Sequence, residues 1–204
     1  QFPSGRKIEV TETRTANIPN LADPLTFTTL TTTQRINNAT HTSTFDAVTR
    51  EWTFRSPLSR VSKTKLDAAG RVTRIETPGL DPVDVVYVDG LISSVSRGGR
   101  SFTFAYDDRR KLIRVTDPLS RPVSYEYDEA GRVTSQIPSF GSPTSFTYDA
   151  EGNVVTVSPP GRPSHSFTYS DANQLETYTT PSPDAVTTTR YRYNKDGQVV
   201  EILR

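Results

Sequence analysis

One short phrase recurs along the sequence at an almost constant interval, and this repeat limits the fold more than any other feature. Five strong copies open at Tyr106, Tyr127, Tyr148, Tyr169 and Tyr193, with spacings of 21, 21, 21 and 24 residues. Three weaker copies open at Phe45, Leu66 and Tyr87, with spacings of 21 and 21 residues between them and 19 to the next copy. A fixed period of this length indicates tandem copies of one supersecondary unit. We therefore predict an array of eight repeats of about 21 residues over 45–204.

Each copy has the pattern of a β-hairpin. Aromatic residues alternate into the anchor, as in Phe102, Phe104 and Tyr106, and residues two apart lie on one face of a strand. Asp or Asn usually follows the anchor, and the fourth position after the anchor is Gly in four copies, Gly70, Gly131, Gly152 and Gly197, and Asn173 in another. The shorter copy has Asp89 and Gly90, the pair favoured in a two-residue turn. We expect these turn residues to adopt the positive φ angles that close each hairpin.

The second strand of each copy carries apolar residues six and usually nine positions after the anchor, such as Val154 and Val157. These two positions face opposite ways in a regular strand. Either a β-bulge brings them to one face, or both faces of the sheet are partly covered. Proline-rich links, such as 117–122 and 158–163, then join the copies and mark strand ends, because proline lacks an amide donor.

Composition favours the same all-β class. Of the 204 residues, 30 are Thr, 20 are Ser and 15 are Pro, and only 33% are hydrophobic. Threonine suits a pleated strand better than a helix, because branching at Cβ restricts χ1. Residues 1–44 fit the repeat less well: 5–10 resemble the second half of a copy, and 26–33 read as one exposed strand with Phe27 and Leu30 as its apolar contacts. We predict that 1–44 form degenerate N-terminal strands of the same sheet, with a solvated rather than a binding face.

Charge and hydropathy exclude several classes of function. A net charge of +1 without a basic run gives no field that would gather nucleic acid. The longest apolar runs, such as 83–88, are far shorter than the roughly 20 residues of a spanning helix, so we expect no membrane insertion. The absence of Cys excludes disulfides and thiolate chemistry. Because the chain starts at Gln1 rather than Met, we expect it to be a piece of a larger protein.

The phrase Y-D-x-x-G-R/N-V/L with a period near 21 resembles the YD repeat of the RHS (rearrangement hotspot) family. The resemblance covers residues 45–204, where the aromatic, Asp, Gly and apolar positions hold phase over several copies. It implies tandem β-hairpins that form a curved, spirally extended antiparallel sheet, here a partial RHS shell. Bacterial members use the shell to enclose a toxin, as in the B and C subunits of insecticidal toxin complexes, and teneurins carry a similar barrel on the cell surface.

The resemblance also implies partners and a location. Eight hairpins are too few to close a shell, so we expect an open edge at each end, which makes edge-to-edge self-association a further expectation. The partners implied are the remainder of the parent RHS shell and its cargo domain, at the surface of a bacterium or secreted from it. The DPxG-type motif that ends the shell of toxin-bearing members is not visible, because Asp117-Pro118-Leu119-Ser120 has Ser in place of Gly.

No constellation of residues indicates catalysis, a cofactor or a metal. The two histidines, His41 and His165, stand in unlike contexts and are expected at the surface. No Gly-x-Ser-x-Gly elbow occurs. Acidic pairs such as Asp107-Asp108 fall in the turns, and turn formation explains them better than a glycosidase pair or a calcium site. The acceptor-like Asn38-Ala39-Thr40 is taken as incidental.

The anchor tyrosines are the feature most open to a binding role, because an exposed ring can stack on a sugar. They are Tyr87, Tyr106, Tyr127, Tyr148, Tyr169 and Tyr193. We favour a structural role, in which each ring packs on the ring of the next copy as an aromatic ladder that fixes register. Two functions follow: a structural shell segment that encloses or presents a cargo domain or, as the alternative, a secreted or surface adhesion module that binds carbohydrate or protein partners.

Overall fold

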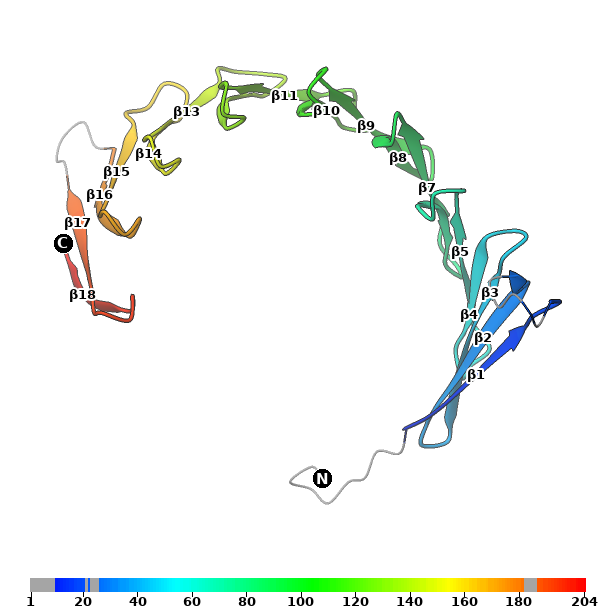
Figure 1. Ribbon diagram of the computed structural model, residues 1–204. Helices are drawn as coiled ribbons and strands as arrows, with labels where there is room; N and C mark the ends of the chain where they lie inside the picture. Colours follow the sequence, from blue (N-terminus) through cyan, green and yellow to red (C-terminus); the bar gives the residue numbers. More distant parts are fainter. Residues whose placement is uncertain (1–9, 21, 23–25, 182–186) are drawn as a thin grey trace. The chain divides into compact units, whose positions relative to one another are not determined.

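The computed structural model describes residues 10–20, 22, 26–181 and 187–204, and this part of the chain is all-β. It holds eighteen strands and no α-helix, and hence no helix long and apolar enough to span a membrane. The chain divides into two compact units, 1–102 and 103–204. In each unit, strands that are consecutive in the sequence lie side by side (Figure 1).

The strands of the first unit run antiparallel to their neighbours from β1 through to β8. They are β1 Val10–Asn17, β2 Thr29–Ile36, β3 Ala39–Asp46, β4 Glu51–Arg55, β5 Val61–Leu66, β6 Val72–Glu76, β7 Val83–Val88 and β8 Leu91–Arg97. Strand β9, Arg100–Tyr106, contains the boundary between the units.

The second unit is also a meander, in which strands pair in sequence order from the end of β9 to β18. They are β10 Leu112–Thr116, β11 Pro122–Tyr127, β12 Val133–Ile137, β13 Thr144–Tyr148, β14 Val154–Ser158, β15 His165–Tyr169, β16 Leu175–Thr179, β17 Thr188–Tyr193 and β18 Val199–Leu203. Each anchor residue ends a strand or lies one residue before its end. Except in the shorter copy that opens at Tyr87, the next strand begins six residues after the anchor.

A β-bulge in each later hairpin decides how the second strand is oriented. Tyr127 pairs with Val133, but Glu126 pairs with Ser135, so one residue of β12 has no partner on β11. The residues six and nine after the anchor, Val133 and Gln136, are therefore opposite Tyr127 and Tyr125 and share their face. Of the two alternatives left open by the sequence, the bulge is the one that the structure adopts. We call this face, which carries the anchors, the aromatic face.

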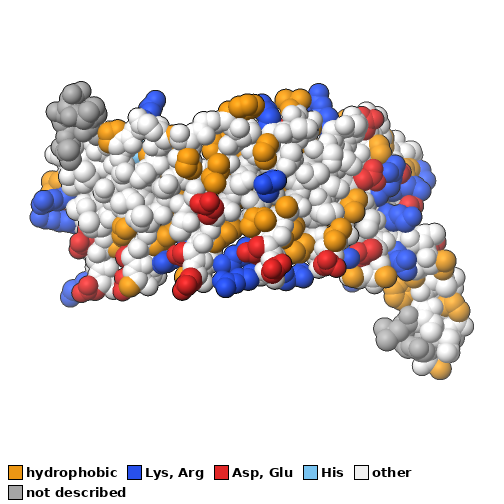
Figure 2. All heavy atoms as spheres, turned by 90° about the horizontal axis from the view of Figure 1, so that it is seen from above, with side chains coloured by type: hydrophobic (Ala, Val, Ile, Leu, Met, Phe, Trp, Pro, Cys, Tyr) orange, Lys and Arg blue, Asp and Glu red, His pale blue; other side chains and the backbone are white. Residues whose placement is uncertain are grey.

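The opposite face is polar, and we call it the hydroxyl face. Threonines that face each other across a hairpin join their side chains there, as in Thr147 Oγ1 to Thr156 Oγ1 at 2.6 Å and Thr168 Oγ1 to Thr177 Oγ1 at 2.7 Å. No hydrophobic side chain of the described residues is fully buried. Figure 2 shows the hydrophobic side chains in small scattered groups and many of the charged ones along one edge. Each unit therefore lacks the closed core of a globular domain, and contacts between adjacent strands hold it together.

The first strands differ from the prediction in extent. The strand expected over 26–33 is β2, which begins at Thr29 and continues to Ile36, because the two-residue turn at Asn37 and Asn38 lets it pair with β3 over eight residues. Strand β1 extends to Asn17, well beyond the 5–10 segment assigned to a half repeat, and residues 5–9 of that segment lie outside the described residues. The division of the chain at residue 44 stays a prediction.

Candidate functional site

The turn after most anchors is held by one side chain whose oxygen accepts one or two main-chain amides. Asp128 Oδ1 accepts the Arg132 amide at 2.9 Å, and Asp67 Oδ1 accepts the amides of Ala69 and Arg71 at 2.8 and 2.9 Å. Asn194 makes the same contacts in the last copy, with the amides of Asp196 and Gln198. Because these hydrogen bonds favour the ionised carboxylate, the amide of Arg71 lowers the pKa of Asp67, and that of Arg132 lowers the pKa of Asp128.

Positive φ angles close these turns at the residues singled out by the sequence. The turn glycines Gly70, Gly90, Gly131, Gly152 and Gly197 have φ values of 77°, 79°, 86°, 95° and 74°. Asn173 takes the same place with a φ of 57°, and Asp89 before Gly90 has a φ of 49°. Residues with a Cβ rarely adopt this region, and Gly and Asn do so at the lowest cost.

The strand ladder between successive repeats is short. Within a hairpin four residue pairs form, as between β13 and β14, whereas β14 and β15 join two repeats through only two pairs. Two pairs also join β12 to β13, and three join β16 to β17. Further contacts are therefore needed to fix each repeat to its neighbour.

The anchor tyrosine supplies such a contact. Tyr148 Oη donates to the main-chain oxygen of Val133 at 2.7 Å, and Val133 is the first residue of the second strand of the preceding repeat. The same bond joins Tyr87 to Val72, Tyr127 to Leu112, Tyr169 to Val154 and Tyr193 to Leu175, at 3.1, 2.6, 3.0 and 2.9 Å. Each hydroxyl thus satisfies a carbonyl that lies beyond the end of the short ladder.

The side chain just before that carbonyl covers the tyrosine ring. Arg132 Cζ lies 4.7 Å from the ring centroid of Tyr148, and Arg132 Nη1 donates to the main-chain oxygen of Asp149 at 2.9 Å. Arg71 lies over Tyr87 at 4.3 Å and Lys111 over Tyr127 at 5.3 Å, which are cation–π distances. We call the anchor tyrosine together with this side chain and carbonyl of the preceding repeat the inter-repeat clamp.

Uncharged residues take the place of the cation in the last copies. Asn153 stands where Arg132 stands one repeat earlier, and its Nδ2 donates to Oδ1 of Asn173 in the next turn at 3.0 Å. Asp128 positions Arg132 through a bond from Nε to Oδ2 at 2.7 Å, and Asp149 does the same for Asn153 at 3.0 Å. The turn aspartate therefore closes its own hairpin and also orients the side chain that reaches the next one.

The clamp differs from the expected aromatic ladder. No two anchor rings are in contact among the described residues, whereas each of five anchor hydroxyls bonds to the main chain. Anchors lie on alternate strands, so rings of successive copies are about 9.6 Å apart, twice the strand spacing of about 4.8 Å. That gap is too wide for ring stacking. Direct ring contacts join adjacent strands instead, such as Phe167 with Tyr178 at 5.2 Å between centroids.

The sequence pattern contained the residue that covers the ring but gave it no role. It is the fifth residue after each anchor, and its basic or amide character, in Arg71, Lys111, Arg132, Asn153, Gln174 and Gln198, is the signal that could have identified it. A second turn of the same design was also missed. Asp117 and Arg121 close the link between β10 and β11 with the hydrogen bonds of the hairpin turns. That segment is thus an ordinary strand connection.

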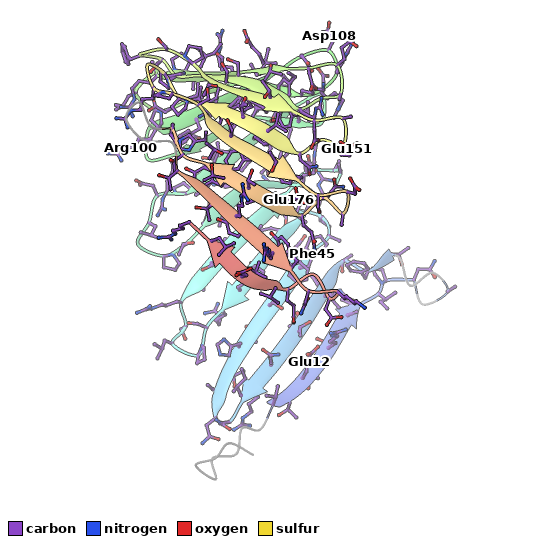
Figure 3. All side chains as sticks on the ribbon, turned by 90° about the vertical axis from the view of Figure 1, so that its left-hand side faces the viewer. Glu12, Phe45, Arg100, Asp108, Glu151 and Glu176 are labelled. Atoms are coloured by element: carbon purple, nitrogen blue, oxygen red, sulfur yellow. The ribbon has the colours of Figure 1, made fainter. Side chains whose placement is uncertain are left out.

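The other candidate residues are separate from the clamp. His41 is exposed, and His165 is half-buried with its Nδ1 2.8 Å from Tyr178 Oη. Within the described ranges, no three His, Cys, Asp or Glu side chains form a group that could hold a metal ion. The turn carboxylates sit in separate turns, as Glu151 and Asp108 illustrate in Figure 3.

A shallow hollow of about 1050 Å³ lies on the aromatic face of the first unit. Its floor includes Glu12, Gln34 and His41, which are direct cross-strand partners on β1, β2 and β3. Phe54 borders the hollow, and its ring also contacts the ring of Trp52, with 5.9 Å between the two centroids. No anchor tyrosine lines this hollow. A ligand there would meet Phe54 and polar side chains rather than the clamp.

Comparison with protein families gave one match that covers almost the whole chain. The family model described as "Teneurin YD-shell" matches residues 13–204. The chain belongs to the teneurin YD-shell family. The repeat, the all-β fold and the hairpin array predicted from the sequence agree with this membership. Comparison with curated protein sequences gave no match.

Solved structures of toxin complexes share the fold of this YD-shell chain. A TcdB2–TccC3 structure without the hypervariable C-terminal region matches with a TM-score of 0.62 and 16% identity, over 86% of this chain and 12% of the solved chain. The Tc holotoxin pore of Photorhabdus luminescens matches with a TM-score of 0.58 and 14% identity, over 87% of this chain and 13% of the solved one. The present chain thus corresponds in fold to a small part of a much longer shell-forming polypeptide.

Proposed function

We propose that this chain is a wall segment of a YD shell that encloses or presents a cargo domain of its parent polypeptide. The inter-repeat clamp is the observation that carries the proposal. It recurs at Tyr87, Tyr127, Tyr148, Tyr169 and Tyr193, and at each of these places it joins a repeat to its predecessor through side chains of the repeats themselves. A wall needs this property, because each hairpin must bind an almost identical neighbour without a closed core.

The clamp also favours a wall over tyrosine-mediated adhesion. A sugar-binding tyrosine offers its ring face and its hydroxyl to the ligand. Here the hydroxyl of Tyr148 is bonded to the main chain and its ring is covered by Arg132. The hypervariable C-terminal region named for the TcdB2–TccC3 structure suggests the kind of partner, and we propose a secreted or cell-surface location for the parent protein.

Limited proteolysis of the polypeptide whose reading frame contains residues 1–204 tests the proposal. We expect an enclosed segment that resists digestion while the wall is intact. The variant Y148F/Y169F should make that segment accessible, because it removes two clamp hydrogen bonds, whereas the matched variant Y125F should not. Equal digestion of all segments in the intact polypeptide would refute enclosure. A glycan array on the isolated chain with Tyr148→Ala addresses the adhesion alternative: tyrosine-dependent sugar binding would contradict the structural role.

A further inference from the structure

The hollow beside Phe54 carries an uncompensated positive charge. Its lining includes three arginines, Arg14, Arg55 and Arg60, against one acid, Glu12. Glu12 is already paired with Arg14, with 2.6 Å between Oε1 and Nε. Among the described residues, the side chains of Arg55 and Arg60 form no hydrogen bond and no ion pair, and both residues are exposed. The hollow therefore offers two cationic groups to a ligand.

The turn that ends at Arg60 shows why this arginine has no partner. In the turn between β10 and β11, Asp117 Oδ1 accepts the Arg121 amide at 2.9 Å, and Asp117 Oδ2 accepts a second bond from Arg121 Nε at 2.7 Å. The turn between β4 and β5 repeats the first bond, because Ser56 Oγ accepts the Arg60 amide at 3.1 Å. A hydroxyl is uncharged and cannot neutralise the guanidinium. The sequence thus keeps the turn and omits its acid.

A short segment of main chain beside these arginines also lacks a strand partner. Strand β3 pairs with β2 from Ala39 onward, but with β4 only from Thr42 onward, where Thr42 faces Arg55. Residues 39–41 therefore extend past the end of β4, and His41 lines the hollow there. This gap lies within the sheet, between β3 and the link that follows β4. An unpaired strand edge accepts an extended peptide through main-chain hydrogen bonds, which a sugar cannot supply in the same way.

Phe54 gives the hollow an apolar surface. Its ring is 43% exposed, and only the small residues Ser43 and Ser62 face it from the neighbouring strands β3 and β5. A guanidinium binds a carboxylate through paired, charge-assisted hydrogen bonds. A peptide that carries both acidic and apolar residues therefore matches the arginines and this ring together.

We propose that the hollow binds an extended acidic peptide segment, with a carboxylate on Arg60 and main-chain pairing to residues 39–41. Charge complementarity selects this occupant, because three arginines stand against one glutamate in the lining. The inference goes beyond the shell function and does not depend on it, since no anchor tyrosine lines the hollow. Exposed charges are screened by salt, so the affinity should fall as the ionic strength rises.

Fluorescence anisotropy of a short labelled peptide of alternating glutamate and valine, titrated with the 204-residue chain, tests the proposal. We expect saturable binding that weakens with added salt. Arg60→Gln removes the charged donor and should weaken binding by about tenfold, as expected for the loss of one charge-assisted hydrogen bond. Ser56→Asp should weaken binding as much, because an aspartate there would pair with Arg60 as Asp117 pairs with Arg121.

A matched control separates the hollow from positive charge in general. Arg121 closes the same kind of turn but does not line the hollow, so Arg121→Gln should leave binding unchanged. A peptide with glutamine in place of glutamate should not bind. The proposal would be overturned if the unmodified chain failed to bind the acidic peptide at any concentration. Unchanged affinity in R60Q and S56D, with circular dichroism showing both to be folded, would also overturn it. So would an equal loss in R121Q, or tighter binding of hyaluronan oligosaccharides than of the peptide.

Discussion

The first three strands and the later repeats keep neighbouring strands together in different ways. Strands β1, β2 and β3 pair over eight residues each and have no register shift. In the second unit, successive repeats share only two or three residue pairs, and each hairpin has a bulge. The long ladders need no clamp, whereas the short ones are extended by a tyrosine hydroxyl. Main-chain pairing in the long ladders and side-chain clamping at the short ones are therefore two ways in which this chain keeps neighbouring strands together.

The aromatic cluster beside the first strands should give the largest effect. Trp52 packs between Phe45 and Phe54, with ring centroids 5.1 and 5.9 Å away. Trp52→Ala should cost about 3 kcal/mol in the free energy of unfolding, because it removes a large ring from both contacts. Urea denaturation followed by circular dichroism measures the loss. Phe140→Ala, at a ring that is 81% exposed, is the control and should change little. Equal losses in the two variants would show that the ring contacts do not stabilise this region.

The clamp should give the next largest effect, and it can be divided into two parts. Tyr148→Ala removes ring and hydroxyl and should cost about 2 kcal/mol, whereas Tyr148→Phe removes one hydrogen bond and should cost about 1 kcal/mol. Tyr125→Phe provides the matched control, since Tyr125 lies on the same face and its hydroxyl makes no hydrogen bond among the described residues. Hydrogen exchange should show a loss of amide protection in β12 and β13. If β2 and β3 lose as much protection as β12 and β13, the distinction drawn between ladders and clamps is wrong.

A turn glycine should give a smaller effect confined to one hairpin. Gly152 has a φ of 95°, and no atom lies within 4 Å of the position that a Cβ would take. Gly152→Ala should therefore cost about 1 kcal/mol through backbone strain alone. Gly152→Asn should cost less, since Asn173 occupies the equivalent turn with positive φ. Thermal unfolding measures which of the two variants is less stable. An equal loss of stability in both would point to a cause other than φ.

Acid should weaken the clamped repeats more than the hairpin of β2 and β3, although the contribution of each carboxylate is small. The Arg71 and Arg132 amides lower the pKa of Asp67 and Asp128, and the Arg121 side chain lowers that of Asp117. A lowered pKa in the folded state contributes stability above the ordinary value of 3.8, which is lost as the pH falls through the lowered values. Hydrogen exchange between pH 5 and 2 should show these turns opening before the Asn37 turn, which has no carboxylate. Simultaneous opening would contradict this assignment.

Much of the fold could be predicted because its signals are local. The anchor, turn residue and glycine of each hairpin lie within five residues of one another, and their spacing alone predicted the strands from β3 onward. The fold class followed from the same spacing, and the resemblance of the repeated phrase to the YD repeat indicated the family. The bounds of β1 and β2 could not be predicted from the sequence, because threonine-rich segments have no alternation of apolar and polar residues that marks where a strand starts.

The sequence by itself determined the repeat, the hairpins and the chemistry of the turns, since these depend on residues that are neighbours in the chain. Only the tertiary structure decided that a bulge puts positions six and nine on the aromatic face, and that each anchor hydroxyl meets a carbonyl rather than another ring. The tyrosine and its acceptor are 15 residues apart in most copies and 18 in the last one. Their contact depends on how many residues of two repeats pair, and that number is a property of the assembled strands that no single hairpin encodes.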